Sequence, residues 1–329
     1  MNRDKIIVTG GAGLIGSHLC RRLLAEGNQV ICIDNFATSR PDLILDLLGN
    51  PAFELIRRDV TIPYFMRASQ IYHLASAASP PTYQNFPTET IRTAVLGTIH
   101  MLELARQSGA AMLLASSGSV YGNATVSTVS EDYWGNVNPV GVRSCNEEGK
   151  RAAEAACVAY RLQYHTDTRI ARIFNTYGPG VDIRDGRAIP NFIYNALRGE
   201  DIVIYGNGMQ TRCFCYVDDM VDGLIRLMNT RSRDRNEPVN LGSDREIAVR
   251  SLAEEVIRLT GSRSRIVNLT PDKPVRRHRT PDLRRAHAML GWEATTPITE
   301  GLSHTIEYFT RAMQDDPRRV RQASWVEMD

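Results

Sequence analysis

Residues 5–16 of the chain read Lys-Ile-Ile-Val-Thr-Gly-Gly-Ala-Gly-Leu-Ile-Gly, a short apolar run followed by a turn rich in glycine. Lys5–Thr9 has the pattern of a buried β-strand, and Ser17–Glu26 has the apolar spacing of a helix. Glycine lets a backbone turn tightly and approach a ligand closely, and a helix that follows directs its positive N-terminal end at the turn. A strand, a glycine turn and a helix in this order predict a parallel α/β sheet with a pyrophosphate site at its first crossover.

A carboxylate stands at the end of the second predicted strand, Gln29–Ile33. Asp34 is placed where an acidic side chain accepts hydrogen bonds from the ribose hydroxyls of a dinucleotide, and its charge would repel a 2′-phosphate. The sequence therefore favours NAD over NADP. The alternative is a glycine-rich turn that binds no ligand. The expected cofactor contacts in this part of the chain are Gly10, Gly13, Leu14, Ile15, Asp34 and Asn35.

Strands and helices alternate through the first half of the chain. The pattern predicts a Rossmann-like, doubly wound parallel sheet over residues 1–175. Residues 176–314 have shorter helices and loops rich in Gly and Arg, which predict mostly a smaller C-terminal α/β substrate lobe with some segments returning to the sheet. A charged tail, 315–329, follows. The predicted strands are Phe53–Ile56, Ile71–Leu74, Met112–Ala115 and Arg169–Ile173, and the predicted helices are Leu43–Leu48, Thr88–Ser108 and Val140–Tyr164.

Two further groups of residues follow predicted strands. Cofactors bind at the carboxyl ends of strands in open α/β sheets, so we expect Leu74, Ala75 and Ser76 to contact the dinucleotide. Asp59 and Val60 could meet an adenine in the same way. For Asp59 a plain turn role is an equal alternative.

Composition excludes several classes of protein. The chain has 329 residues, 43% of them hydrophobic, and a formal net charge of +2, which argues against nucleic acid or a membrane surface as partner. No apolar run approaches the roughly 20 residues of a membrane helix. The N-terminus enters the first strand almost at once, so we expect no signal peptide and a cytoplasmic protein. The six cysteines lack metal-ligand spacing beyond Cys213-Phe214-Cys215, so we expect reduced thiols and no metal.

Several stretches together resemble the extended short-chain dehydrogenase/reductase family that acts on nucleotide sugars, and within it the UDP-glucuronate decarboxylases. They run from residue 5 to about residue 310. The resemblance implies a bound NAD and a nucleoside-diphosphate sugar, with UDP favoured. The stretches are Val8–Gly16, Ser79-Pro80-Pro81, Glu131–Gly135, Arg143-Ser144-Cys145, Arg172–Pro179, Tyr205–Gly208, Gln210-Thr211-Arg212, Asn240-Leu241-Gly242 and Leu290-Gly291-Trp292.

The resemblance also implies where the substrate binds. Guanidinium groups suit phosphate oxygens because they donate two parallel hydrogen bonds. Arg212 and Arg279 look like diphosphate or nucleotide contacts, and Asn175 looks like a polar contact near the sugar or phosphate. The remaining expected substrate contacts are Tyr205 and, in the stretch Ala78–Tyr83, which we expect to be a rigid loop with hydroxyls, Ser79 and Tyr83.

The chain departs from the family's pattern at the catalytic helix. Enzymes of this family place a Tyr four residues before a Lys, whose charge lowers the pKa of the phenol so that it can take a proton from a sugar hydroxyl. Here Lys150 is present, but Asn146 stands at the Tyr position, and an amide cannot act as that base. The family's Ser/Thr-Ser-Glu reads Ser117-Gly118-Ser119. We expect Lys150, Ser117, Asn146 and Ser119 to form the catalytic group, with Lys150 also contacting the cofactor.

Three functions fit this departure. The chain could be an NAD-dependent enzyme that changes a nucleotide sugar through a transient ketone, as the decarboxylases do. It could be an epimerase acting on an unusual nucleotide sugar. It could also be a natural or engineered protein that binds NAD and nucleotide sugar without turnover. Lys150 itself, Cys145 and Ser117 are candidate replacement bases.

The two long predicted helices bear on assembly. Thr88–Ser108 and Val140–Tyr164 resemble a pair that forms a four-helix homodimer interface, or else they only pack on the sheet.

Overall fold

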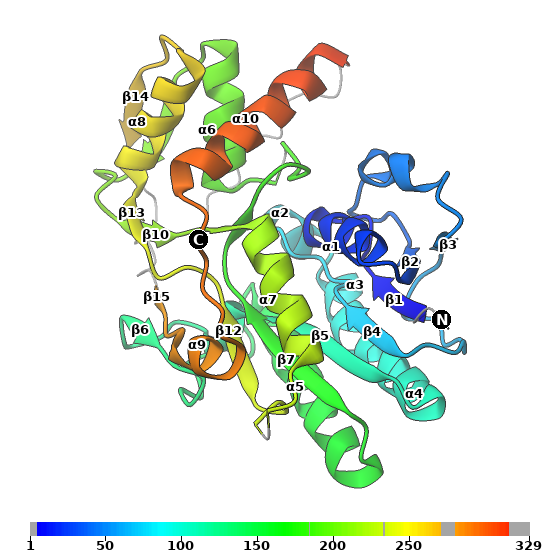
Figure 1. The fold of residues 1–329 in the computed structure, drawn as a ribbon. Coiled ribbons are helices and arrows are strands. Elements are labelled where there is room, and N and C mark those ends of the chain that lie inside the picture. The colour runs from blue at the N-terminus through cyan, green and yellow to red at the C-terminus, as the bar shows by residue number, and fades with distance from the viewer. Residues whose placement is uncertain (1–4, 184, 233, 271–279, 316–329) are drawn as a thin grey trace.

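One parallel sheet organises the chain (Figure 1). The computed structural model describes residues 5–183, 185–232, 234–270 and 280–315. Its seven-stranded sheet has the order β12-β7-β5-β4-β1-β2-β3, and every neighbouring pair is parallel. The predicted doubly wound fold class is therefore confirmed. The strands are β1 (Lys5–Thr9), β2 (Gln29–Asp34), β3 (Phe53–Arg57), β4 (Gln70–His73), β5 (Ala111–Ser117), β7 (Thr168–Ile173) and β12 (Pro238–Leu241).

Helices cover both faces of the sheet, because successive side chains of each strand point to opposite faces and both sets are apolar. Ile6 and Val8 of β1 pack with the buried side chains of α1 (Leu14–Ala25) and α7 (Val217–Asn229). Ile7, between them, packs on the other face, with α4 (Thr98–Ser108) and α5 (Ser144–Tyr164). The unbroken run Ile6-Ile7-Val8 thus supplies the core on both sides.

Some element boundaries differ from those predicted. The long helix expected over Thr88–Ser108 consists of α3 (Pro87–Arg92), a π-helical turn and α4. The helix expected from Val140 begins instead at Ser144, because the preceding residues form turns: the Gly141 N–H donates to the Asn138 carbonyl oxygen, and the Ser144 N–H donates to the Gly141 carbonyl oxygen.

Two short segments were predicted wrongly. Residues expected to form a rigid loop before Tyr83 form the short helix α2 (Pro80–Asn85), whose two prolines at the start have φ values that suit a first turn. The helix expected over Leu43–Leu48 is two separate 3₁₀ turns, Pro41–Leu43 and Leu45–Leu47.

A second lobe has its own apolar core. Buried side chains of α6 (Ala188–Arg198), α8 (Val249–Thr260) and α10 (Ile298–Asp315) pack together with those of β9 (Ile202–Tyr205). Figure 1 shows these helices gathered apart from the helices that cover the sheet. The other elements of the second half are β8 (Thr176–Tyr177), β10 (Thr211–Cys213), β11 (Cys215–Tyr216), β13 (Glu246–Ala248), β14 (Ile266–Leu269), β15 (Thr280–Pro281) and α9 (Arg284–Leu290), and β6 (Thr128–Val129) pairs with β15.

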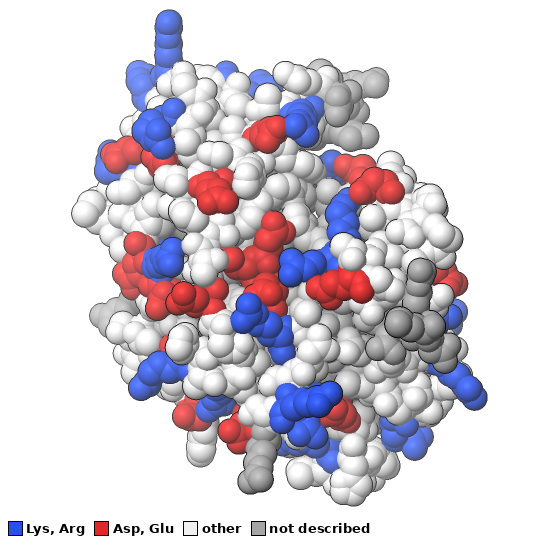
Figure 2. Space-filling model, in the orientation of Figure 1, with Lys and Arg blue, Asp and Glu red and all other residues white. Residues whose placement is uncertain are grey.

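The charged side chains, the helices and the cysteines can be compared with the expectations from composition. On the face drawn in Figure 2, basic and acidic side chains are interspersed. Within the described ranges, no helix is long and apolar enough to cross a membrane, and no three His, Cys, Asp or Glu side chains group so as to hold a metal ion. All six cysteines are buried and none forms a disulfide.

Candidate functional site

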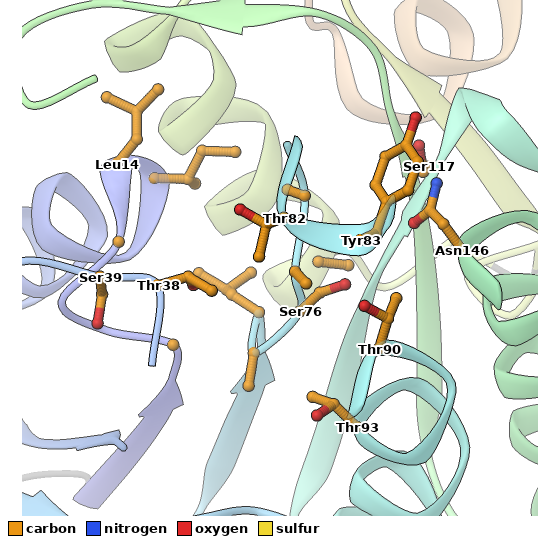
Figure 3. A pocket seen from close by; sticks show the side chains of 18 of the residues that line it. Leu14, Thr38, Ser39, Ser76, Thr82, Tyr83, Thr90, Thr93, Ser117 and Asn146 are labelled. Carbon is orange, nitrogen blue, oxygen red and sulfur yellow. The ribbon is translucent and has the colours of Figure 1, made fainter. Parts of the chain in front are cut away.

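A cavity of about 690 Å³ lies along the carboxyl ends of the sheet strands. Figure 3 shows its polar lining, from Thr38 and Ser39 at one end to Ser117 and Asn146 at the other. Because parallel strands end at one edge of a sheet, residues far apart in sequence meet here. The cavity lining includes most of the residues predicted from sequence: Gly10, Gly13, Leu14, Ile15, Asp34, Asn35, Asp59, Val60, Leu74, Ala75, Ser76, Tyr83, Ser117, Ser119, Asn146, Lys150, Asn175 and Arg212.

The glycine turn leaves no room for side chains. Gly10 has φ +69°, and a Cβ atom there would lie 2.8 Å from the backbone of Ala75. A Cβ atom on Gly16 would lie 2.2 Å from the carbonyl oxygen of Gly10. Gly13 is the N-cap of α1 and supplies no side-chain acceptor to the first-turn N–H groups. The start of this helix therefore offers backbone donors to an anion in the cavity, as a dinucleotide pyrophosphate requires.

Asp34 is held by the turn and retains room for a ligand. Its carboxylate accepts hydrogen bonds from the backbone N–H groups of Ala12 (3.0 Å) and Phe36 (2.9 Å) and from the Ser39 hydroxyl (2.6 Å). A carboxylate has about four acceptor positions, so one position is left for a ribose hydroxyl. The adenosine end of the cavity thus fits NAD.

Asp59 has the turn role that the sequence offered, and it lies where a contact with an adenine stays a prediction. It ends a turn by accepting hydrogen bonds from the backbone N–H and the hydroxyl of Thr61, at 2.8 and 2.7 Å, and it also lines the cavity. Asn35 donates to its other oxygen at 2.9 Å. Burial acts to raise the pKa of Asp59, but the hydrogen bonds from Thr61 and Asn35 lower it overall, so this carboxylate stays ionised.

The opposite end of the cavity holds the predicted catalytic group. Ser117 ends β5, and its Oγ accepts a hydrogen bond of 3.1 Å from the backbone N–H of Ser119. Asn146, in the first turn of α5, donates from Nδ2 to Ser119 Oγ at 3.3 Å. Figure 3 shows Asn146 and Ser117 at the end of the cavity that the Tyr83 ring also borders. Two hydroxyls and an amide therefore stand where the reacting sugar would lie.

Lys150 lies one helical turn beyond Asn146. Its Nζ donates a hydrogen bond of 2.6 Å to the carbonyl oxygen of Ala115, which ties the side chain to β5. Burial lowers the pKa of Lys150 to about 8, against the raising effect of the Glu154 carboxylate. His73 lies nearby, and burial and the charge of Lys150 lower its pKa to about 3, so His73 is neutral. The His73 Nδ1 shares a 2.7 Å hydrogen bond with the Thr9 hydroxyl.

A buried polar network supports this end of the sheet. Glu154 receives hydrogen bonds from Arg172 at 2.8 and 3.0 Å and from the Ser116 hydroxyl at 2.5 Å. Arg172 also donates to the Tyr121 hydroxyl, which in turn donates to Asn240 at 2.7 Å. Tyr121 is fully buried and holds strands together rather than facing the cavity.

Four arginines line the cavity, Arg58, Arg143, Arg187 and Arg212, of which sequence reasoning assigned only Arg212. Arg143 stacks over the Tyr83 ring at 5.7 Å, and Arg187 pairs with Asp185. Burial lowers the pKa of Arg212, yet a guanidinium remains charged at neutral pH. Two of the missed arginines share one signal: Arg143 and Arg187 each stand immediately before a helix, α5 and α6, whereas Arg58 follows β3.

Two further predicted substrate residues, Ser79 and Tyr205, are not among the described residues that line the cavity. The Ser79 hydroxyl shares a 2.7 Å hydrogen bond with that of Thr82 at the start of α2; Thr82, and not Ser79, is among the cavity-lining residues. Tyr205 ends β9, where its carbonyl oxygen accepts a hydrogen bond from Gln210, and it too is not part of the described lining. Arg279 lies outside the described residues.

Known proteins resemble the chain along most of its length. Residues 6–242 match the NAD dependent epimerase/dehydratase family. The chain is 46% identical over 313 residues to UDP-glucuronic acid decarboxylase 1 of Danio rerio, a match that covers 95% of this chain and 74% of that protein. It is 50% identical over 301 residues to UDP-glucuronic acid decarboxylase 6 of Arabidopsis thaliana, covering 91% and 86%.

Solved structures of proteins that bind UDP-sugars are similar to the chain in fold. UDP-glucuronic acid 4-epimerase from Bacillus cereus, in complex with UDP-glucuronic acid and NAD, superposes with a TM-score of 0.83 at 26% identity, covering 94% of this chain and 99% of that chain. UDP-glucose 4-epimerase from Thermotoga maritima, with UDP-glucose, gives the same TM-score, identity and coverage.

Proposed function

The chain belongs to the NAD dependent epimerase/dehydratase family, and from this premise we propose that it changes a UDP-linked sugar acid without net oxidation or reduction. One cavity carries the proposal. The glycine turn and Asp34 lie at one end of it, and the guanidinium groups of Arg143, Arg187 and Arg212 line it elsewhere. The first end suits NAD, and the arginines suit a substrate with several negative charges.

The chain's own residues would hold the cofactor in extended form. The glycine turn and the N-terminus of α1 would take the pyrophosphate, Asp34 the adenosine ribose, and Lys150 the ribose near the reacting ring. When bound, NAD accepts a hydride from a sugar carbon and later returns it.

The charges of the cavity support an anionic sugar. Arg143, Arg187 and Arg212 all line it, and a guanidinium binds phosphate or carboxylate oxygens with two parallel hydrogen bonds. In this proposal some of these guanidinium groups bind the nucleoside diphosphate, and the others bind a carboxylate on the sugar. UDP-glucuronic acid, the substrate in the names of the relatives, has both groups.

Decarboxylation follows directly from the chemistry of such a substrate. Oxidation of the hydroxyl carbon β to the carboxylate gives a β-keto acid, which loses CO₂ readily. The carbon that carried the carboxylate takes a proton from water, and reduction of the resulting ketone regenerates the cofactor. In this proposal Ser117, Ser119 and Asn146 hold the reacting sugar hydroxyl by hydrogen bonds.

A second candidate, epimerisation, shares the first half of this reaction. It is favoured by Gly118, which lines the cavity and lets the Phe174 ring approach where other residues would place a side chain, and by the epimerases among similar structures. Asn146 favours a third candidate, a protein that binds without turnover.

Mass spectrometry of products from a panel of UDP-, GDP- and dTDP-sugars and sugar acids tests the proposal. Loss of CO₂ from UDP-glucuronate is the expected result. Unchanged mass with a new chromatographic position would instead identify an epimerase. Calorimetric binding without product would identify a binder, and no binding to any of these compounds would refute the proposal. Arg212→Met should weaken binding, whereas Arg198→Met, a surface ion-pair partner of Glu200, should not.

We also propose a homodimer that pairs the helices α3–α4 and α5 of two copies. Apolar side chains on these helices are exposed in the single chain: Ile91 by 41% and Leu162 by 71%. Analytical ultracentrifugation should show a dimer, and Leu162→Glu should shift it toward monomer.

A further inference from the structure

The reaction end of the cavity lacks the usual phenolic base. Resting on the proposed function, a group there must accept the proton of the sugar hydroxyl when the carbon is oxidised. Asn146 cannot, because an amide only donates and accepts hydrogen bonds, and its Nδ2 is already engaged with Ser119 Oγ.

Neighbouring hydroxyls and thiols are also unsuited. Ser117 needs an adjacent base to become reactive, and its Oγ accepts a backbone N–H. The Tyr83 hydroxyl is buried in the protein, although the ring borders the cavity. Cys145 donates its thiol to the Tyr83 carbonyl oxygen at 3.4 Å, and burial raises its pKa.

Lys150 meets the requirements of geometry. It lines the same cavity as Ser117 and Asn146, and its Nζ is fixed by the 2.6 Å hydrogen bond to Ala115 O. A neutral amine keeps two N–H groups and gains one lone pair. One N–H group can therefore remain on Ala115 O while the lone pair is available to a ligand in the cavity. We propose that Lys150 is itself the proton acceptor and donor of the reaction.

The proton and electron balance is simple. As the sugar C–H bond breaks, its electron pair leaves with the hydride to NAD⁺, the O–H proton moves to the Lys150 lone pair, and the C=O bond forms. On return of the hydride to the ketone, the Lys150 ammonium gives the same proton back to oxygen. No further oxidant or reductant is needed.

Burial, and not neighbouring charge, favours a neutral amine at Lys150 near pH 8. Burial lowers its pKa to about 8, and the opposing carboxylate, Glu154, lies on the same helix. That carboxylate is paired with Arg172 at 2.8 Å, so part of its field is cancelled. His73 of β4 is neutral, as shown above. Charged and neutral forms of Lys150 therefore coexist near pH 8, and the neutral form is the minor one below that pH.

Competitive trace labelling with acetic anhydride measures this state without any turnover. The sequence holds three lysines, Lys5, Lys150 and Lys273, so each gives a distinct peptide in mass spectrometry. We expect Lys150 to label with an apparent pKa near 8, and the exposed Lys5 to label with the ordinary value of about 10.4. An ordinary pKa at Lys150 would overturn the inference and leave the proposed function standing.

Single-turnover formation of reduced cofactor at 340 nm tests the role itself. In the native chain the rate should rise with pH up to about 8. Lys150→Arg keeps the positive charge but cannot act as a base, and it should lose roughly 10²- to 10⁴-fold in rate while still binding NAD in calorimetry. Lys5→Arg is the matched control and should match the native chain. A Lys150→Arg variant with the native rate and pH profile would overturn the inference. The native chain could form no reduced cofactor with any sugar even though labelling gives Lys150 a low pKa. That result would overturn the proposed function and with it this role of Lys150.

Discussion

Asn146 Nδ2 donates a hydrogen bond of 3.3 Å to Ser119 Oγ. This contact ties the first turn of α5 to the short helical turn after β5, at the end of the cavity that Lys150 also lines. Both side chains are neutral, and neither can carry a proton between substrate and solvent at ordinary pH. The effect of this arrangement on catalysis can be measured by replacing residues that line the cavity.

Asn146→Tyr should raise the rate of hydride transfer. A phenol at this position lies one helical turn from Lys150, whose charge lowers the pKa of a neighbouring hydroxyl. General-base catalysis is worth roughly 10²- to 10⁴-fold, and the single-turnover rate at 340 nm measures it. Asn146→Phe supplies the same ring without the hydroxyl and should give no gain. Equal rates for the Tyr and Phe variants would contradict the prediction.

Asp34→Asn should reduce the preference for NAD over NADP. The carboxylate accepts three protein hydrogen bonds and leaves one position for ribose, and its charge repels a 2′-phosphate. Since a hydrogen bond to a charged group is worth about 1.5–3 kcal/mol, we expect NAD affinity to fall about tenfold or more in calorimetry. Asp46→Asn removes the same charge from a surface ion pair with Arg21 and should leave both affinities unchanged. An unaltered affinity ratio in Asp34→Asn would exclude a role in cofactor selection.

Gly118→Ala should destabilise the fold and weaken sugar binding. A Cβ atom there would lie 3.0 Å from the Phe174 ring, which lines the cavity, so the ring must shift. Overpacking of this kind costs about 1–3 kcal/mol in the free energy of unfolding, read from denaturant titration. Gly49→Ala, where a Cβ atom meets nothing within 4 Å, should change stability by no more than about 0.5 kcal/mol. Similar losses in the two variants would show that Phe174 adapts freely.

The stability of the native chain should rise between about pH 8 and pH 10 relative to Lys150→Met. The folded state lowers the pKa of Lys150 to about 8, whereas an unfolded chain has the ordinary value of about 10.4. In this window the unfolded state binds more protons, so raising the pH favours the folded state. The full difference is of the order of 3 kcal/mol, and urea unfolding of both proteins across this range measures it. Parallel pH curves for the two proteins would mean that Lys150 is not buried as a cation at lower pH.

The first half of the fold was predictable from local pattern. Ile6, Ile7 and Val8 are apolar on both faces of the first strand, and Gly10 and Gly16 have no alternative residue because backbone atoms lie within 3 Å of the place that a Cβ atom would take. Short apolar strands alternating with amphipathic helices leave few other folds. The loop before Tyr83 was predicted wrongly because Ser79-Pro80-Pro81 suits a loop and a helix start equally well.

The sequence by itself therefore determined a parallel sheet, its glycine turn, the carboxylate that follows β2 and the absence of a phenol at residue 146, since each depends on residue type and short spacing. Only the tertiary structure decided that Arg143 and Arg187 border the same cavity as Asp34, because they come from loops before different helices. It alone also showed that Lys150 is buried against Ala115 O, since the surroundings of a side chain depend on packing between segments distant in the chain.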